Sequence, residues 1–387
     1  MNKIKLRFKQ LFVVLKFFFC KFLLIFYRKK FDFWLISERG YDARDNGYVF
    51  FMFLKKEHPE IKVKYVITKD SFDRKRLEND DVINYGTFRH YFAYIKCPIL
   101  ISTHVQGFSP FMDLFSQLDK RNIVKINGKR VLIDHCVRMA KNGINKPNVK
   151  IDKMICSINQ EYEALLNNSG YDSKVLLNLG MPRFDNLFNN LNFKTKNQIL
   201  FMPTWRVKYY RIEKKEFLKS DYYISCMNFL NNRKLIDFLE KNDIEFVFYP
   251  HIEMQKFISC FSTKSDKIKI CTANEKIVED LLIESKILIT DYSSVFFDFA
   301  YLEKPILFYH FDNDENLAMY SRRWFNFEKD ALGPIFYDDK SLVDYLTCLT
   351  NYKMDNNYLT KAREFFPSKN NDNCEKVFSE IKKLSLE

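Results

Sequence analysis

The stretch Lys286–Asp312, KILITDYSSVFFDFAYLEKPILFYHFD, constrains the fold more than any other part of this sequence. Ile287–Thr290 is a short β-branched and apolar run, as expected of a strand buried on both faces. After a polar turn, Val295–Leu302 has the length and apolar spacing of a helix, and Pro305 precedes a second buried strand at Ile306–Tyr309. The order strand, turn, helix, strand predicts a βαβ unit of a parallel sheet.

The polar turn in this unit carries Asp291, Ser293 and Ser294. Open parallel sheets bind ligands at the carboxyl ends of their strands, and the first amides of the following helix can hold an anion. Helix capping uses the same residue types and the same amides, so both roles stay open here. We expect the turn to hold the diphosphate of a nucleotide-activated donor, and we include Asp298 of the following helix among the donor-binding candidates.

Short buried runs alternate with helical stretches along the rest of the chain, in two series. The first series of predicted strands is Phe33–Ser37, Val63–Thr68, Ile99–Ser102, Val131–Asp134, Met154–Ser157 and Val175–Leu179. The second series is Gln198–Met202, Phe246–Tyr249, Lys269–Cys271, Ile287–Thr290 and Ile306–Tyr309. Alternation of this kind predicts parallel α/β sheets.

Two such series suggest an α/β protein of GT-B-like architecture, with two Rossmann-like domains and a cleft between them. We place the N-terminal, acceptor-side domain at residues 31–188 and the C-terminal, nucleotide-donor-binding domain at residues 198–387. An Asn- and Lys-rich linker at residues 189–197 separates them. This inference from the fold does not by itself give an activity.

The amino-terminal residues 1–30 carry most of the net positive charge of +13. Nine of the 62 basic residues lie in Met1–Phe31, which has no acidic residue, and the rest of the chain holds 53 basic against 49 acidic residues. A nucleic-acid-binding protein would show basic surface across its folded body, so we expect no nucleic-acid partner.

The apolar run Leu11–Tyr27 is interrupted by Lys16 and Lys21, and is shorter than the about 20 residues that a spanning helix needs. We expect residues 1–30 to form a basic amphipathic helix that lies on the anionic, cytoplasmic face of the cell membrane, as a peripheral anchor. A spanning helix, and a helix that faces a partner or the core, are the alternatives.

The nine Cys are scattered without a C-x-x-C or Cys/His ligand spacing, so the sequence predicts neither a zinc site nor a disulfide framework. The motifs G-x-x-x-x-G-K-[ST], H-E-x-x-H and G-x-S-x-G are absent, and nine Gly in all leave no glycine-rich phosphate loop. No cofactor is firmly indicated, and a divalent cation stays open.

Two histidines follow predicted strands at positions suited to chemistry. His135 follows Val131–Asp134, and His251 follows Phe246–Pro250. Histidine can act as a base toward a hydroxyl or as a cation against a phosphate, because its pKa lies near neutrality. If two domains close on each other these strand ends face one cleft, so we expect His135 and His251 to be catalytic. The alternative is that each merely caps its strand.

Further candidates also follow predicted strands or lie in polar loops. Thr204 and Arg206 end the first strand of the second series, and their hydroxyl and guanidinium suit a phosphate. Arg322 and Arg323 lie in a basic and aromatic loop that suits a phosphate or a cytosine ring, or is a plain solvated patch. Weaker candidates for the acceptor side or the cleft are Arg39, Asp42, Asp45, Asn46, His104, Arg183 and Asp185.

Several of these segments together resemble the CDP-glycerol glycerophosphotransferase family, which makes teichoic acids and related capsule or envelope polymers. The matching motifs are SERGYDARDNG at 37–47, ISTHVQG at 101–107, GMPRFD at 180–185, MPTWR at 202–206, YPH at 249–251 and LITDYSSVFFD at 288–298. The resemblance spans residues 33 to 335 in order. Where the family commonly has His-Gly, this chain has His135-Cys136.

The resemblance implies a GT-B enzyme, peripheral to the cytoplasmic face, that moves glycerol phosphate or ribitol phosphate from a CDP donor to a lipid-linked acceptor. It implies His135 as the base toward the acceptor hydroxyl. It also implies that the donor phosphates are surrounded by His251, Ser293, Ser294 and an Arg at 322 or 323.

We therefore expect transfer of glycerol phosphate from CDP-glycerol to a hydroxyl of a lipid-linked glycan of teichoic acid or capsule, with release of CMP. A ribitol phosphate transferase that uses CDP-ribitol, or a sugar transferase of the same fold that uses a UDP- or CMP-sugar, is the alternative within enzymes. A non-catalytic membrane-docking scaffold is the alternative from another class.

Overall fold

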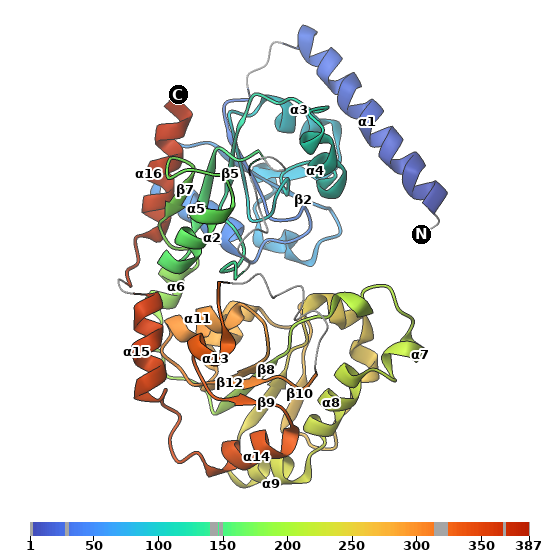
Figure 1. Cartoon of the computed structure of the whole chain (residues 1–387). Coiled ribbons are helices and arrows are strands. Elements are labelled where there is room, and N and C mark those ends of the chain that lie inside the picture. The colour runs from blue at the N-terminus through green and yellow to red at the C-terminus, as the bar shows by residue number, and fades with distance from the viewer. Residues whose placement is uncertain are drawn as a thin grey trace. The chain divides into compact units, whose positions relative to one another are not determined.

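The computed structural model of the chain describes residues 3–27, 31–139, 146, 150–312, 324–366 and 369–386. Its contacts divide the chain into two compact units. The first unit comprises residues 1–137, 141–186 and 370–387, and the second comprises residues 138–140 and 187–369. Each unit contains one parallel sheet with helices around it (Figure 1). The predicted α/β fold with two parallel sheets is confirmed, and the cleft that we predicted between the units stays a prediction.

The first sheet has seven parallel strands in the order β3-β2-β1-β4-β5-β6-β7. The strands are β1 (Trp34–Ser37), β2 (Val63–Ile67), β3 (Val82–Asn84), β4 (Ile99–Ser102), β5 (Lys129–Leu132), β6 (Lys153–Cys156) and β7 (Leu176–Asn178). The strand order reverses between β1 and β4. In open α/β sheets such a switch point, at the carboxyl ends of the strands, is where ligands bind.

Helices cover both faces of the first sheet because the strand side chains alternate between the faces. Leu35 of β1 packs with α1, α3 and α4, whereas its neighbour Ile36 packs with α2 and α16. The helices of this unit are α1 (Lys3–Phe26), α2 (Asn46–Glu57), α3 (Phe88–Lys96), α4 (Met112–Lys120), α5 (Asn159–Asn168) and α16 (Asn373–Leu386). Short 3-10 helices lie at Phe72–Arg76 and Asn79–Asp81, and α6 (Phe184–Asn189) leads from the first unit into the second.

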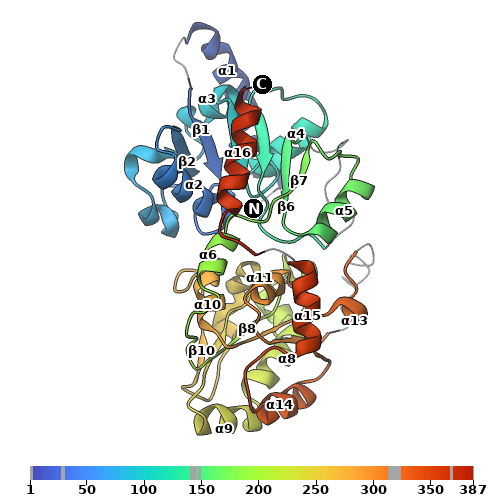
Figure 2. The ribbon, with the colours of Figure 1, turned by 90° about the vertical axis from the view of Figure 1, so that its left-hand side faces the viewer.

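The last helix, α16, belongs to the first unit, whereas we expected residues 198–387 to form one domain. Figure 2 shows α16 running along one face of the first sheet. Its apolar side chains, including Val377 and Ile381, are buried in the same core as Ile36. The carboxylate of Asp185 accepts hydrogen bonds from the amides of Asn373 and Cys374, at 2.8 and 2.9 Å. Core packing and this cap together hold the helix on the first sheet.

The second sheet has six parallel strands in the order β10-β9-β8-β11-β12-β13, with its switch point between β8 and β11. The strands are β8 (Gln198–Met202), β9 (Glu245–Phe248), β10 (Ile268–Ile270), β11 (Ile287–Thr290), β12 (Ile306–Tyr309) and β13 (Ile335–Phe336). The helices are α7 (Lys214–Phe217), α8 (Asp221–Leu230), α9 (Arg233–Lys241), α10 (Val278–Glu284), α11 (Val295–Tyr301), α13 (Phe327–Asp330), α14 (Asp339–Cys348) and α15 (Asn356–Phe365). Short 3-10 helices lie at Val207–Tyr209 and Ile252–Cys260.

The βαβ unit predicted at 286–312 is present as β11, α11 and β12, and Leu288 of β11 pairs in parallel register with Ile306 of β12. One face of the second sheet packs on α8, α9 and α14 through residues such as Phe201 and Ile289. On the other face, Phe296 of α11 contacts Phe308 with ring centroids 5.2 Å apart. The strands β3 and β13, with three and two residues, were not predicted from the sequence.

Candidate active site

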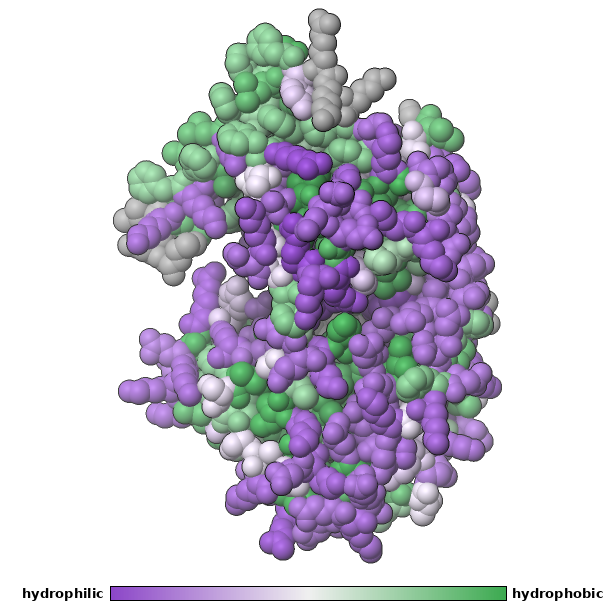
Figure 3. Space-filling view, turned by 180° about the vertical axis from the view of Figure 1, so that it is seen from behind, coloured by the Kyte–Doolittle hydropathy of each residue, from purple (hydrophilic) through white to green (hydrophobic). Residues whose placement is uncertain are grey.

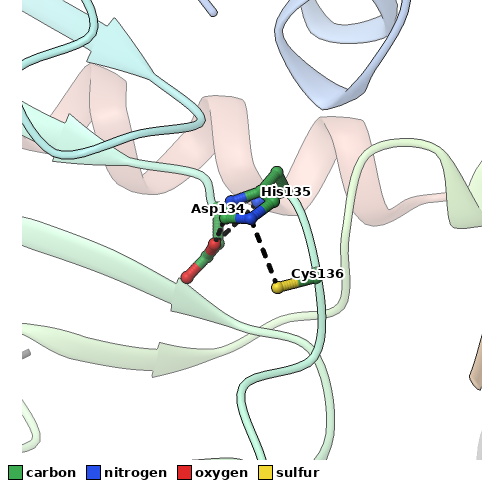
Figure 4. Close-up of side chains that lie close together, drawn as sticks. All are labelled: Asp134, His135 and Cys136. Atoms are coloured by element: carbon green, nitrogen blue, oxygen red, sulfur yellow. Dashed lines mark hydrogen bonds and ion pairs between the residues drawn. The ribbon is translucent and has the colours of Figure 1, made fainter. Parts of the chain in front are cut away.

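His135 lies beyond the end of β5 at the carboxyl edge of the first sheet. Its ring Nδ1 is 3.2 Å from the carbonyl oxygen of Thr103 and 3.0 Å from Oδ1 of Asp134 (Figure 4). Both of these atoms are acceptors, so we assign the proton of the neutral ring to Nδ1. Nε2 then keeps its lone pair, which is the atom that a general base needs.

The carboxylate of Asp134 orients this ring. The side chain is buried, and its Oδ1 also accepts a hydrogen bond of 2.7 Å from the amide of His135. Its backbone has a φ of +49°, a conformation that Asp tolerates better than most residues. Burial lowers the pKa of His135, but the charge of Cys136 and the hydrogen bond to Asp134 outweigh burial and raise this pKa well above its usual value. Asp134 therefore favours the imidazolium that forms when His135 takes up a proton.

His104, a weaker candidate from the sequence, lies directly against His135. The two rings stack with centroids 4.1 Å apart and planes 15° apart. Nδ1 of His104 is 2.9 Å from the hydroxyl oxygen of Thr103. The structure thus brings together two of the histidines that follow first-sheet strands, one after β4 and one after β5.

Three of the predicted polar residues hold the backbone of Asp134 and His135 in place. The side-chain amide of Asn46 donates to the carbonyl oxygen of Asp134 at 2.9 Å. Nη1 of Arg183 donates to the carbonyl oxygen of His135 at 3.0 Å and to Oδ1 of Asp45 at 2.8 Å. Asn46, Arg183 and Asp45 are therefore positioning residues in the first unit.

Other weak candidates from the first unit have different tasks. Nε of Arg39 donates to Oδ2 of Asp42 at 2.6 Å, so these two predicted residues pair with each other. Asp185 caps α16, as described above. The contacts of these three residues lie within the scaffold of the first unit and give no reason to place them against an acceptor.

Glu38 fixes the loop that presents Asp45 and Asn46. Its buried carboxylate accepts hydrogen bonds from the amides of Asp45, at 2.8 Å, and Tyr48, at 3.0 Å. Burial, together with the charges of Asp45 and Asp42, raises the pKa of Glu38 to about 8. In the sequence, only its place in a polar loop distinguishes this carboxyl group.

The raised pKa of Glu38 predicts a stability that falls as the pH rises. Between its ordinary pKa of 4.5 and about 8, the folded state binds this proton more tightly than the unfolded state, so stability is lost across that window. We expect the wild type to lose about 2 kcal/mol more than Glu38→Gln between pH 5 and pH 7, because Gln does not titrate. Urea unfolding at both pH values measures this difference, and equal losses in the two proteins would show that Glu38 titrates normally.

His251 lies at the carboxyl end of a strand of the second sheet, after β9. It is the N-cap residue of the 3-10 helix Ile252–Cys260, and its Nδ1 accepts a hydrogen bond of 3.2 Å from the amide of Glu253. The proton of the neutral ring therefore sits on Nε2, which is a donor suited to a phosphate oxygen. The ring lies nearly parallel to Trp205, with centroids 6.1 Å apart, so His251 adjoins the loop after β8.

Arg206 and Asp291, both predicted to bind the donor, form a buried ion-pair network instead. The side chain of Arg206 is 1% exposed, and its Nε and Nη2 donate to the two carboxylate oxygens of Asp312 at 2.9 and 2.7 Å. Nη1 lies 2.9 Å from Oδ2 of Asp291, whose Oδ1 accepts from the amide of Thr204 at 2.8 Å. Because the guanidinium is occupied and buried, we assign Arg206 and Asp291 the task of joining the loops after β8, β11 and β12.

The remaining donor candidates lie around this network. Ser293 and Ser294 are half-buried in the turn between β11 and α11, and Ser294 is the N-cap residue of α11. Asp298 is buried in α11. Arg322 and Arg323 lie outside the described residues.

Besides Glu38, two residues that the sequence did not single out matter in this geometry, namely Asp134 and Asp312. The signal for Asp134 was its place directly before His135 at a strand end. Asp312 is the last residue of the stretch Lys286–Asp312, and no pattern within this stretch suggests an ion pair. Its pairing with Arg206 joins residues that are far apart in the chain, and a single sequence does not show such a contact.

Comparison with known sequences decides the family. The sequence profile of CDP-Glycerol:Poly(glycerophosphate) glycerophosphotransferase matches residues 17–383. This chain belongs to that family. The resemblance inferred from the motifs is thereby confirmed.

The relatives of the chain act in teichoic acid synthesis, according to their names. The minor teichoic acid biosynthesis protein GgaB of Bacillus subtilis (strain 168) is 29% identical over 368 residues, which cover 91% of this chain and 40% of that protein. A teichoic acid poly(glycerol phosphate) polymerase of Bacillus spizizenii is 32% identical over 196 residues, which cover 49% of this chain and 45% of the polymerase. The matched part of this chain thus spans less than half the length of these relatives.

A solved structure shows the same fold. The wall teichoic acid polymerase TagF matches with a TM-score of 0.67 and 18% identity, over 90% of this chain and 88% of the TagF chain. At this level of identity the match supports the α/β fold with two parallel sheets.

Proposed function

We propose that this chain transfers glycerol phosphate from CDP-glycerol to a hydroxyl of a lipid-linked cell-envelope glycan, and releases CMP. The observation that carries the proposal is the orientation of His135, whose Nδ1 contacts the buried carboxylate of Asp134 and the carbonyl oxygen of Thr103, so that the lone pair of the neutral ring lies on Nε2. A chain of this family with an oriented base at the ligand-binding edge of its first sheet fits activation of an acceptor hydroxyl.

In the proposed step, Nε2 of His135 takes the proton of the acceptor hydroxyl. The hydroxyl oxygen forms a bond to the β-phosphorus of CDP-glycerol, and the bond from that phosphorus to the oxygen of CMP breaks. Asp134 stabilises the imidazolium that results. Phosphoryl transfer of this kind depends on positioning and on neutralising phosphate oxygens more than on covalent help from the protein.

The second unit supplies the donor site in this proposal. Nε2 of His251 carries a proton that it can donate to a phosphate oxygen. Thr204 lies in the loop after β8, which is next to β9, and Ser293 and Ser294 lie in the turn after β11, which is next to β8. Arg322 or Arg323 adds a positive charge next to the phosphates. The pair of Arg206 and Asp312 acts indirectly, because it fixes the loop that carries Thr204.

Isothermal titration with CDP-glycerol, CDP-ribitol and a UDP-sugar tests the choice of donor. The proposal predicts that CDP-glycerol binds most tightly, and that His251→Ala weakens its binding by about tenfold or more, the loss expected for a hydrogen bond to a charged group. Tighter binding of CDP-ribitol or of a UDP-sugar would show that this nucleotide, and not CDP-glycerol, is the donor. The absence of any nucleotide binding would favour the scaffold alternative.

We also propose that α1 anchors the chain to an anionic membrane surface. No helix that the structure describes is long and apolar enough to cross a membrane. One stripe of α1, formed by Val13, Phe17, Cys20 and Leu24, is buried against the first unit. The packing with α3 includes Phe17 and Tyr94, whose ring centroids are 6.2 Å apart.

The opposite stripe of α1 is apolar and exposed, which is unusual for a helix already packed on a domain. Figure 3 shows the apolar residues gathered along this helix. The exposed residues recur three or four positions apart, as neighbours on one helix face do: Phe8, Leu11, Phe12, Leu15, Phe18, Phe19, Phe22, Ile25 and Phe26. The sequence showed apolar residues all round this helix, and the structure divides them into a buried and an exposed stripe.

Basic residues lie along both edges of the exposed stripe. At 100° per residue, Lys5 and Lys9 fall along one edge, and Arg7 and Lys21 fall along the other, and all four are exposed. Lysine and arginine can keep their charges at the lipid headgroups while the aromatic side chains between them enter the acyl layer. This pattern fits an anionic leaflet as the surface that α1 covers.

Replacing Phe12 and Phe19 by Ser in the full chain is expected to weaken sedimentation with anionic phospholipid vesicles by about tenfold or more. A fully buried apolar side chain of this size contributes roughly 1.5–3 kcal/mol, so even partial insertion of two exceeds a tenfold effect. Tyr337→Ser is the matched control, because Tyr337 is 66% exposed in the second unit. Unchanged vesicle binding of the double variant would contradict the anchor.

A further inference from the structure

Asp134, His135 and Cys136 form a group of side chains that could hold a metal ion, each with a ligand atom within 4.8 Å of the others. Among the residues that the structure describes, no other group of three His, Cys or acidic side chains lies this close together. We propose that His135 Nε2 and Cys136 Sγ bind a zinc ion or a similar thiophilic divalent cation, with Asp134 as the outer partner of His135. We further propose that the bound ion switches off the transfer reaction.

The distance between the two ligand atoms fits one tetrahedral ion. Sγ of Cys136 is 3.6 Å from Nε2 of His135 (Figure 4). With a zinc–sulfur distance of about 2.3 Å, a zinc–nitrogen distance of about 2.0–2.1 Å and a tetrahedral angle, the two ligand atoms of one ion lie about 3.5–3.6 Å apart. The thiol and the imidazole are therefore spaced for a shared ion without a rearrangement of the loop.

The outer contact of His135 also matches a metal ligand. A histidine that binds zinc usually donates its other ring N–H to a carboxylate or a carbonyl oxygen, which fixes the ring and strengthens the ligand nitrogen. Nδ1 of His135 lies 3.0 Å from Oδ1 of Asp134 and 3.2 Å from the carbonyl oxygen of Thr103. The ring is thus already oriented with Nε2 toward the thiol.

An ion can reach this pair from solvent. The side chain of His135 is 36% exposed, and Cys136 is half-buried. Six of the nine cysteines, by contrast, are buried. Two protein ligands leave the other coordination positions of the ion to water. Such a site holds an ion less tightly than four protein ligands do, so we expect a chelator to remove the ion. This pair does not have the spacing of a common zinc motif, in which neighbouring ligands are separated by two or more residues, because His135 and Cys136 are adjacent.

Inhibition follows from the identity of the ligand atom. A metal ion on Nε2 occupies the lone pair with which His135 would take the proton of the acceptor hydroxyl. This consequence rests on the proposed function, whereas binding of the ion rests only on the geometry of the pair. The two claims therefore have separate readouts.

Cobalt(II) titration of the chelator-treated full chain tests the binding. Cobalt bound to a thiolate gives a charge-transfer absorption band, which identifies cysteine as a ligand independently of activity. We expect the wild type to show this band, and Cys136→Ser and Cys136→Ala to lose it and to bind cobalt about tenfold or more weakly. Cys348→Ser is the control, because Cys348 is exposed and lies in the other unit, and it should keep the band. Circular dichroism confirms that each variant is folded.

A band of equal size in folded Cys136→Ser, or no band in the wild type, would overturn the binding site. A second experiment adds zinc to a transfer assay. We expect zinc to inhibit the wild type reversibly, and Cys136→Ala to need at least about tenfold more zinc for the same inhibition. A cobalt band in a protein that transfers no glycerol phosphate would leave the metal site standing and overturn the proposed function. If the cobalt band appears but zinc does not inhibit transfer, the metal site stands and only the proposed inhibition is overturned.

Discussion

Replacing His135 by Ala is expected to lower the transfer rate at saturating CDP-glycerol by on the order of 10³, which lies within the usual contribution of a general base. The affinity for CDP-glycerol should stay unchanged, because the donor binds to the second unit in our proposal. Asp134→Asn should also slow transfer, since it removes the charge that orients the ring and stabilises its protonated form.

Single-turnover assays with radiolabelled donor measure the rate, and isothermal titration measures donor affinity in the same variants. His58→Gln is a suitable control, because His58 follows the carboxyl end of α2, at the opposite edge of the sheet from the strand ends that carry His135. His251→Ala, in contrast, should weaken donor binding. If His135→Ala and His251→Ala both kept rates near that of the wild type, the proposed mechanism would be wrong.

Replacing Arg206 by Met is expected to reduce the free energy of unfolding by about 3–5 kcal/mol, the loss that follows when one partner of a buried ion pair is removed. The carboxylates of Asp291 and Asp312 are buried on either side of the guanidinium. Without Arg206 both would remain in the protein interior without their cation. The loop that carries Thr204 would lose its anchor as well.

Urea unfolding followed by circular dichroism and tryptophan fluorescence measures this loss. The control is Arg233→Met, because the side chain of Arg233 is 90% exposed and its pair with Asp237 is a surface ion pair. Such pairs contribute about 0–1 kcal/mol, so the control should be nearly neutral. A loss below about 1 kcal/mol for Arg206→Met would contradict the buried network.

Much of the fold followed from local sequence patterns. Buried runs such as Ile287–Thr290 and Ile99–Ser102 are strands at the predicted positions, because fully buried parallel strands need continuous apolar residues. The polar residues that follow these strands lie at the carboxyl edges of the sheets, because all strands of a parallel sheet end at the same edge. His135 and His104 were therefore found from the sequence, and the structure adds that their rings stack.

Long-range pairing could not be predicted in this way. Arg206 looks like an exposed phosphate ligand until β12 is placed beside β11, which brings Asp312 to its guanidinium. The sequence of α16 predicts an amphipathic helix but does not show on which sheet it packs. The cap that ties it to the first unit comes from Asp185, which lies 188 residues before Asn373. For α1 the apolar residues surround the helix, and only packing against α3 shows which stripe remains exposed.

The most direct test of the proposed reaction follows radiolabelled glycerol phosphate from CDP-glycerol into a membrane acceptor while the released nucleotide is identified. Transfer of the phosphorylated alditol breaks the bond from the β-phosphorus of the donor to the bridging oxygen, which leaves with CMP, so label in the acceptor and free CMP should appear in equal amounts. Release of CDP, or binding of CDP-glycerol without any transfer of label, would contradict the proposal.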